Sequence, residues 1–174
     1  MSTARWSRVA IAGLACALAC GCGYTLVGTG SVLPANLETL GVRPFANRTT
    51  RPEIDQRVTE EVSREFAKRG RLKVIADPAQ ADAVLDGAIL DFRTRPVQFN
   101  DAGRASRVES TVMLQATLRV RATDEILWSQ SQLVFREQYD VQDEGDITAQ
   151  ESLALDDIAR GAAGTLVTSI LEGF

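Results

Sequence analysis

RVESTVMLQATLRVRA, residues 107–122, is the stretch that decides the fold. Apolar and polar residues alternate along it, and successive side chains of a β-strand point to opposite faces. The alternation therefore predicts a long strand with one buried and one wet face. The apolar face carries Val108, Val112, Leu114, Ala116, Leu118 and Val120. The wet face carries Arg107, Glu109, Thr111, Gln115, Thr117, Arg119 and Arg121.

Two further extended segments flank this strand. Residues 84–99 precede it across a loop at 100–106, and residues 126–141 follow it across a turn at 123–125. Such turn residues between extended segments are typical of hairpins, so we expect three consecutive antiparallel strands. In the last segment the apolar residues of one parity are expected on the buried face: Leu127, Leu133, Phe135, Tyr139 and Val141.

Two amphipathic helices are predicted to cover that face. The first spans about residues 51–69 and ends at Gly70, and Thr50 and Glu53 have the spacing of a capping box at its start. Its apolar stripe recurs every four residues at Ile54, Val58, Val62 and Phe66. The second is the C-terminal helix, which Thr148 and Glu151 are expected to cap in the same way.

Short strands are also expected at 37–45 and 72–75. The fold class that follows is α+β, a two-layer sandwich with a mostly antiparallel sheet of about four strands covered on one face by two helices. Glycines at 161 and 164 are expected to let the C-terminal helix approach its neighbours closely, because glycine in a helix costs stability without a packing return.

The N-terminus predicts export. Arg5 and Arg8 precede an apolar run at 9–19, which is shorter than the roughly 20 residues that a membrane-spanning helix needs. The small residues that follow resemble the lipobox of bacterial lipoproteins. We predict a signal peptide over residues 1–21 and acylation of Cys22, with Cys20 as the alternative, leaving residues 22–174 as a single domain.

The composition argues against several classes of function. The 174 residues include no histidine, and no cysteine follows Cys22, so the commonest metal ligands, bases and thiol nucleophiles are missing. We therefore predict no enzyme, no metal site and no cofactor. The formal net charge of −4, which includes Arg5 and Arg8 of the signal, disfavours nucleic-acid binding.

Arginines supply the candidate ligand-binding residues. Arg93, Arg95, Arg119 and Arg121 alternate on two of the expected strands, and a guanidinium can bind phosphate bidentately. An anionic lipid head group would suit such a set. Cross-strand ion pairs with Asp91, Glu109 or Glu137 are the alternative interpretation.

Three stretches together resemble a known family: GCGYTLVGTG at 21–30, LGVRPFANRTTRPEIDQRVTEEVSREFAKRGRLKVI at 40–75, and ADAVLDGAILDF at 81–92. They are similar to the LPS-assembly lipoproteins (LptE), most specifically in the Cys-Gly-Tyr start and the entry into the first helix at 47–54. The resemblance implies an α/β sandwich anchored on the periplasmic face of the outer membrane. It also implies two partners, an LptD-type β-barrel translocon that the domain plugs and helps to assemble, and lipopolysaccharide that it binds for insertion into the outer leaflet.

A second interpretation uses the same strand-to-helix unit at 42–66. It also resembles modules of envelope lipoproteins that act as scaffolds or in secretion, which would bind only proteins. Co-purification separates the two, because only the first requires a large barrel partner.

Overall fold

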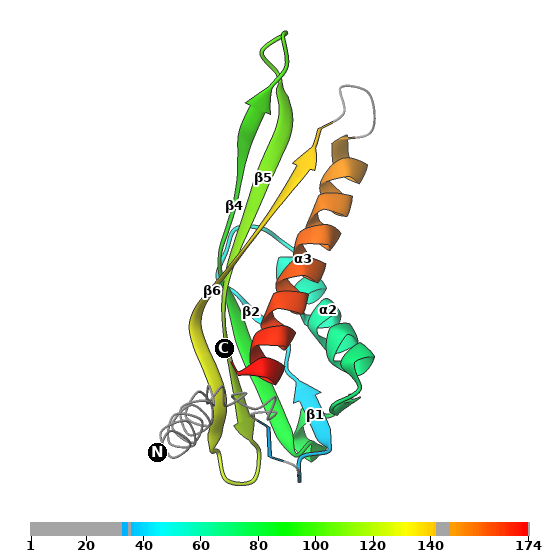
Figure 1. The fold of residues 1–174 in the computed structure, drawn as a ribbon, viewed down its shortest axis with the longest axis vertical. Coiled ribbons are helices and arrows are strands. Elements are labelled where there is room, and N and C mark those ends of the chain that lie inside the picture. The colour runs from blue at the N-terminus through cyan, green and yellow to red at the C-terminus, as the bar shows by residue number, and fades with distance from the viewer. Residues whose placement is uncertain (1–32, 35, 142–146, 174) are drawn as a thin grey trace, which may run out of the picture. The chain divides into compact units, whose positions relative to one another are not determined.

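The computed structural model describes residues 33–34, 36–141 and 147–173. The chain divides into units 1–30 and 31–174, and every described residue belongs to the second. Figure 1 shows its elements in chain order. They are β1 (Thr39–Val42), β2 (Ala46–Asn47), α2 (Ile54–Arg69), β3 (Lys73–Ile75), the 3₁₀ turn η1 (Pro78–Gln80), β4 (Ala83–Phe99), β5 (Ala105–Val120), β6 (Ile126–Asp140) and α3 (Ile147–Glu172).

The sheet is mixed and has six strands in the described residues, in the order β3-β1-β4-β5-β6, with β2 also paired to β4. The expected antiparallel meander is confirmed for β4, β5 and β6. The expectation of about four mostly antiparallel strands is wrong, because β1 pairs in parallel with both β3 and β4, and β2 is also parallel to β4. The strands β1, β2 and β3 have two to four residues each, too few for a periodic pattern to reveal their direction.

One face of the sheet packs against both helices, as expected (Figure 1). Leu118 of β5 stands opposite Leu85 of β4, and Leu114 stands opposite Ile89. All four are fully buried in one core with the predicted α2 stripe and with Ile158, Leu166 and Ile170 of α3. The alternation in residues 107–122 is therefore confirmed as the division between the core face and the outer face. Neither helix of the described residues combines the length and apolarity that crossing a membrane requires.

The predicted capping box at the start of α2 is wrong. The helix begins at Ile54, and Glu53 precedes it in the left-handed region at φ 65° without a side-chain capping bond. The side chain of Asn47 instead organises the approach: its amide donates to the Arg51 carbonyl at 2.8 Å and its oxygen accepts from the Thr49 amide at 2.9 Å. This turn replaces the cap that the S/T-x-x-E spacing indicates. The second expected capping box lies outside the described side chains.

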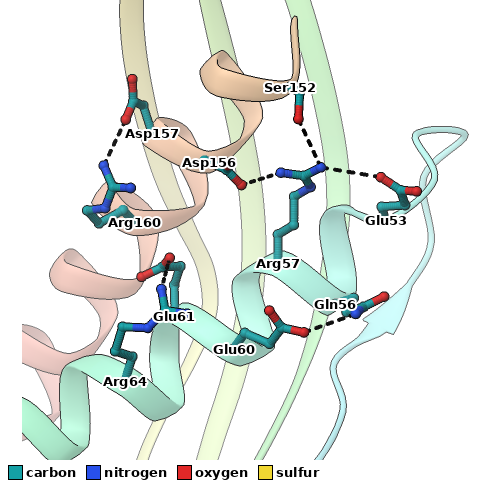
Figure 2. A network of polar contacts seen from close by, with 10 residues as sticks. All are labelled: Glu53, Gln56, Arg57, Glu60, Glu61, Arg64, Ser152, Asp156, Asp157 and Arg160. Carbon is teal, nitrogen blue, oxygen red and sulfur yellow. Dashed lines mark hydrogen bonds and ion pairs between the residues drawn. The ribbon is translucent and has the colours of Figure 1, made fainter. Parts of the chain in front are cut away.

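Polar contacts join α2 to α3 on the side of the helices away from the sheet (Figure 2). Arg57 of α2 pairs with Asp156 of α3 and donates to the hydroxyl of Ser152 at 3.2 Å. It also reaches back to Glu53 at 3.5 Å, and these carboxylates raise its pKa further above the ordinary arginine value. The Arg57 side chain is only 24% exposed, so water screens these contacts less than it screens surface ion pairs. They therefore stabilise the packing of α2 against α3.

An irregularity in β6 changes which of its side chains face the core. Ala116 of β5 pairs with Gln130, but Leu114 pairs with Leu133, so β6 carries one extra residue between them. Such a bulge shifts the alternation by one residue. Trp128 is consequently the residue opposite Leu118. Leu127 lies at a second irregularity, between the residues paired with Leu118 and Arg119, and is partly buried against the core together with Leu133 and Phe135, as expected.

Candidate ligand-binding face

The outer face of β4, β5 and β6, opposite the helices, holds three of the four arginines that the sequence indicated. Arg93 stands opposite Thr111, and Arg95 stands opposite Glu109. Arg119 stands opposite Val84, eight residues further along β5 than Thr111, which corresponds to about 27 Å at 3.4 Å per residue. The register therefore separates Arg119 from Arg93 and Arg95, and the predicted residues do not form one cluster.

The two arginines at the end of β5, Arg119 and Arg121, make contacts within the protein. Arg119 pairs with Asp124 at 3.0 Å and with Asp86 at 3.4 Å. Arg121 follows the strand, and its Nε donates to the backbone carbonyl of Ala81 at 2.7 Å. Both guanidinium groups thus fix the turns at this end of the sheet.

The opposite end of the outer face carries Arg93 and Arg95 in a different setting. The Arg93 side chain is 79% exposed and, within the described part of the chain, pairs with Asp91 on the same strand at 2.6 Å. Arg95 donates to Glu109 across the strands at 2.7 Å, and Gln138 of β6 donates to the same carboxylate at 3.1 Å. The cross-strand pairing that the sequence left as an alternative is therefore present for Arg95.

Glu109 is the buried centre of this arrangement, with only 7% of its surface exposed. Hydrogen bonds from Gln138 and Arg95 hold the pKa of its carboxyl below the ordinary glutamate value, so it stays ionised. A buried carboxylate needs such partners, and removing one would leave charge uncompensated. Arg95 is thereby positioned by Glu109 with its own side chain 71% exposed.

The same end of the face holds two arginines that the candidate set omitted. Arg136 of β6 stands opposite Thr111, so it lies on the other side of that residue from Arg93. It is exposed and makes no ion pair with any residue the structure describes. Arg107 pairs with Asp140 at 2.7 Å in the same region. Alternation places Arg107 on the wet face, but only the register of β6 against β5 reveals that Arg136 stands opposite Thr111 on the same face.

These four residues define the arginine group: Arg93, Arg95, Arg107 and Arg136. Beyond it the β4–β5 hairpin ends in a turn in which the Asn100 side chain accepts from the amides of Ala102 and Arg104. Val97 and Phe99, close to that turn, are among the exposed large apolar residues. In Figure 1 this hairpin extends past the end of the helix layer. The arginine group thus lies on a hairpin whose tip carries exposed apolar side chains, a combination suited to an amphiphilic anion.

The fold is shared by solved bacterial proteins, among them two lipoproteins. Lipoprotein B from Nitrosomonas europaea is 17% identical with a TM-score of 0.51, covering 82% of this chain and 87% of that one. A minor lipoprotein from Acinetobacter baumannii is 12% identical with a TM-score of 0.50, covering 79% and 94%. The PelC dodecamer from Paraburkholderia phytofirmans is 17% identical with a TM-score of 0.50, covering 80% and 92%.

Sequence gives the more specific assignment. The model of the LptE family, described as lipopolysaccharide-assembly, matches residues 37–170. The chain therefore belongs to the LptE lipopolysaccharide-assembly family, as the resemblance of its sequence predicted. No curated protein matches the chain. Cys22 and Cys20, and with them the predicted signal peptide and acylation, lie outside the described residues.

Proposed function

We propose that the chain is an outer-membrane lipoprotein that delivers lipopolysaccharide together with an LptD-type β-barrel. The signal over residues 1–21 is removed, and acylated Cys22, or alternatively Cys20, anchors the domain on the periplasmic face. The domain then plugs the lumen of the barrel and assists its assembly. Membership of the lipopolysaccharide-assembly family across residues 37–170 is the observation that carries the proposal.

We place the lipopolysaccharide site at the arginine group. Guanidinium groups remain charged at any accessible pH and match phosphate geometry with two parallel hydrogen bonds. Arg93 and Arg136 flank Thr111 on neighbouring strands, so their backbones lie about 10 Å apart at 4.8 Å per strand. Both point from an open face, and Glu109 is hydrogen-bonded by Arg95 and Gln138 while Arg136 adds only its charge to lowering the Glu109 pKa.

Arg95 contributes its exposed guanidinium while Glu109 holds it in place. For Arg119 and Arg121 a role in ligand binding stays a prediction of the sequence alone. Their contacts with Asp86, Asp124 and the Ala81 carbonyl favour a structural role. On this proposal, the end of the outer face that carries the arginine group binds the ligand, and the arginines at the other end stabilise the fold.

A paired substitution tests the site. Arg93→Gln with Arg136→Gln removes two exposed charges, and a charge-assisted hydrogen bond contributes about 1.5–3 kcal/mol, so the affinity for purified lipopolysaccharide should fall at least about tenfold. The control is Arg64→Gln with Arg160→Gln, which removes two similarly exposed charges from the helix layer. Affinity is measured by titration of the intact lipoprotein in detergent. Equal affinity in the two double variants would exclude the arginine group as the site.

The scaffold interpretation keeps one supporting observation. The PelC structure with the same fold is a dodecamer, so this architecture is compatible with self-assembly into an oligomer. On that alternative the chain would form a stable oligomer and bind no lipopolysaccharide. Light scattering of the intact lipoprotein, with and without lipopolysaccharide, distinguishes the two functions.

A further inference from the structure

The end of the β4–β5 hairpin contributes no buried residue to the core of the domain. We call residues 97–107 the hairpin tip; each of them is exposed or half-buried. Figure 1 shows this hairpin continuing past the end of the helix layer. A hairpin without a buried face is only marginally stable in water, so core packing does not account for strands of this length.

Two residues of the hairpin tip are large, apolar and exposed. The exposed fraction is 40% for Val97 and 57% for Phe99, and the two lie two residues apart on β4. The other exposed large apolar residues of the described part of the chain, Ile126 and Leu153, lie on β6 and α3. Single exposed apolar residues are ordinary, so the informative feature is that this pair shares one protruding turn.

The turn that follows Phe99 is ordered by its own hydrogen bonds. The Asn100 amide donates to the Arg104 carbonyl at 2.8 Å, and the Gly103 amide donates to the Asn100 carbonyl at 2.9 Å. The Asn100 side chain accepts from two further amides of the turn. The backbone beside Val97 and Phe99 is therefore already ordered, and a ligand that covers these side chains does not have to supply that ordering.

The apolar pair lies next to the arginine group. Gln98, which separates Val97 from Phe99, stands opposite Arg107. Arg95 precedes Val97 by two residues, which is about 7 Å along a strand. Residues 93–107 contain four arginines and one acid, Asp101, a formal net charge of +3. Charge complementarity therefore favours a ligand that joins an anionic group to an apolar one.

We propose that Val97 and Phe99 contact the acyl chains of the lipopolysaccharide molecule whose phosphates the arginine group binds. The inference rests on the proposed function and deepens it, because it assigns the two halves of one amphiphile to neighbouring parts of one hairpin. Lipopolysaccharide carries phosphates and acyl chains together. Contact with the two side chains removes acyl surface from water, which favours binding in proportion to the area covered.

Two forms of the ligand separate the two contacts: intact lipopolysaccharide, and fully deacylated lipopolysaccharide, which keeps its phosphates. The tip variant, Val97→Ser with Phe99→Ser, should bind intact lipopolysaccharide at least about tenfold more weakly, because burial of one such side chain alone changes a binding constant by about that factor. It should bind the deacylated form as tightly as the parent protein does. The arginine variant, Arg93→Gln with Arg136→Gln, should bind both forms more weakly. All titrations use the intact lipoprotein at one detergent concentration.

Ile126→Ser with Leu153→Ser is the matched control, because it removes two apolar side chains that are 59% and 65% exposed elsewhere in the domain. This control should leave both affinities unchanged. Phe99→Trp supplies a second readout that does not depend on the folding of the serine variant. Its fluorescence should shift to the blue with intact but not with deacylated lipopolysaccharide, after subtraction of the same titration of the parent protein, whose Trp128 is 8% exposed.

The outcomes distinguish this proposal from the proposed function. A parent protein that bound neither form would overturn both. A tip variant that bound intact lipopolysaccharide as tightly as the parent, or lost affinity for both forms equally, would overturn only the acyl-chain contact. An equal blue shift of Phe99→Trp with vesicles of phosphatidylethanolamine and phosphatidylglycerol would also overturn it, because the hairpin tip would then be a surface for phospholipid bilayers in general.

Discussion

Gly161 and Gly164 lie one turn apart on α3, so replacing each with alanine gives a matched test of how the helix packs. At Gly161 the new Cβ would overlap the ring of Phe135 on β6. At Gly164 it would meet no atom within 4 Å. The two substitutions are chemically identical and differ only in this contact.

The structure sets the size of the expected difference. Alanine is favoured over glycine in a helix interior by about 0.8–1 kcal/mol, and both variants receive this gain. Only Gly161→Ala also forces Phe135 to move, and overpacking typically costs about 1–3 kcal/mol. Gly164→Ala should therefore be more stable than the parent protein, and more stable than Gly161→Ala by about 1–3 kcal/mol.

Urea unfolding followed by circular dichroism measures both variants. The double variant Gly161→Ala with Phe135→Leu should recover part of the loss, because a smaller side chain makes room for the methyl group. If Gly161→Ala were as stable as Gly164→Ala within about 0.3 kcal/mol, the close packing of Phe135 on Gly161 would be refuted.

Two further predictions concern polar contacts. Arg57→Ala removes the contacts with Asp156 and Ser152 and should lower the free energy of unfolding by about 1–2 kcal/mol in urea titrations. The control Arg64→Ala loses one exposed ion pair and should change that free energy by less than about 0.5 kcal/mol, so equal losses would contradict a stabilising contact between the helices at Arg57. The Asp82 carboxylate accepts hydrogen bonds from the hydroxyl and amide of Thr39 and from the amide of Glu38, and these lower its pKa. The ionised Asp82 carboxylate therefore stabilises the fold above about pH 4, and this contribution is lost as the pH falls through the lowered pKa of the folded state. Asp82→Asn should make the melting temperature depend less on pH in the acid range. Thermal melts in which the variant and the parent protein lose stability equally on acidification would exclude this role.

Sequence reasoning succeeded where one side of a long element is buried. The alternation at residues 107–122 predicted the two faces of β5 because a one-residue slip would expose every core side chain. The four-residue stripe of α2 was equally informative, since Ile54, Val58, Val62 and Phe66 are all buried. Both patterns report local geometry that repeats over many residues.

Features that depend on distant pairing could not be predicted. The parallel partners of β1 are β3 and β4, more than 30 residues away, and nothing in its four residues encodes their direction. The start of α2 depends on the Asn47 side chain reaching the Arg51 carbonyl, which competes successfully with the capping box. At the candidate site, the sequence supplied Arg93 and Arg95, but only the pairing of β6 with β5 placed Arg136 beside them.

The most direct test of the proposed function is a mild-detergent purification of the intact lipoprotein from outer membranes, with mass spectrometry of the proteins that accompany it. Membership of the LptE family leads us to expect a large β-barrel protein in equal amount with the lipoprotein. Recovery of periplasmic or secretion components without such a barrel would contradict a role in lipopolysaccharide delivery and would favour the scaffold interpretation.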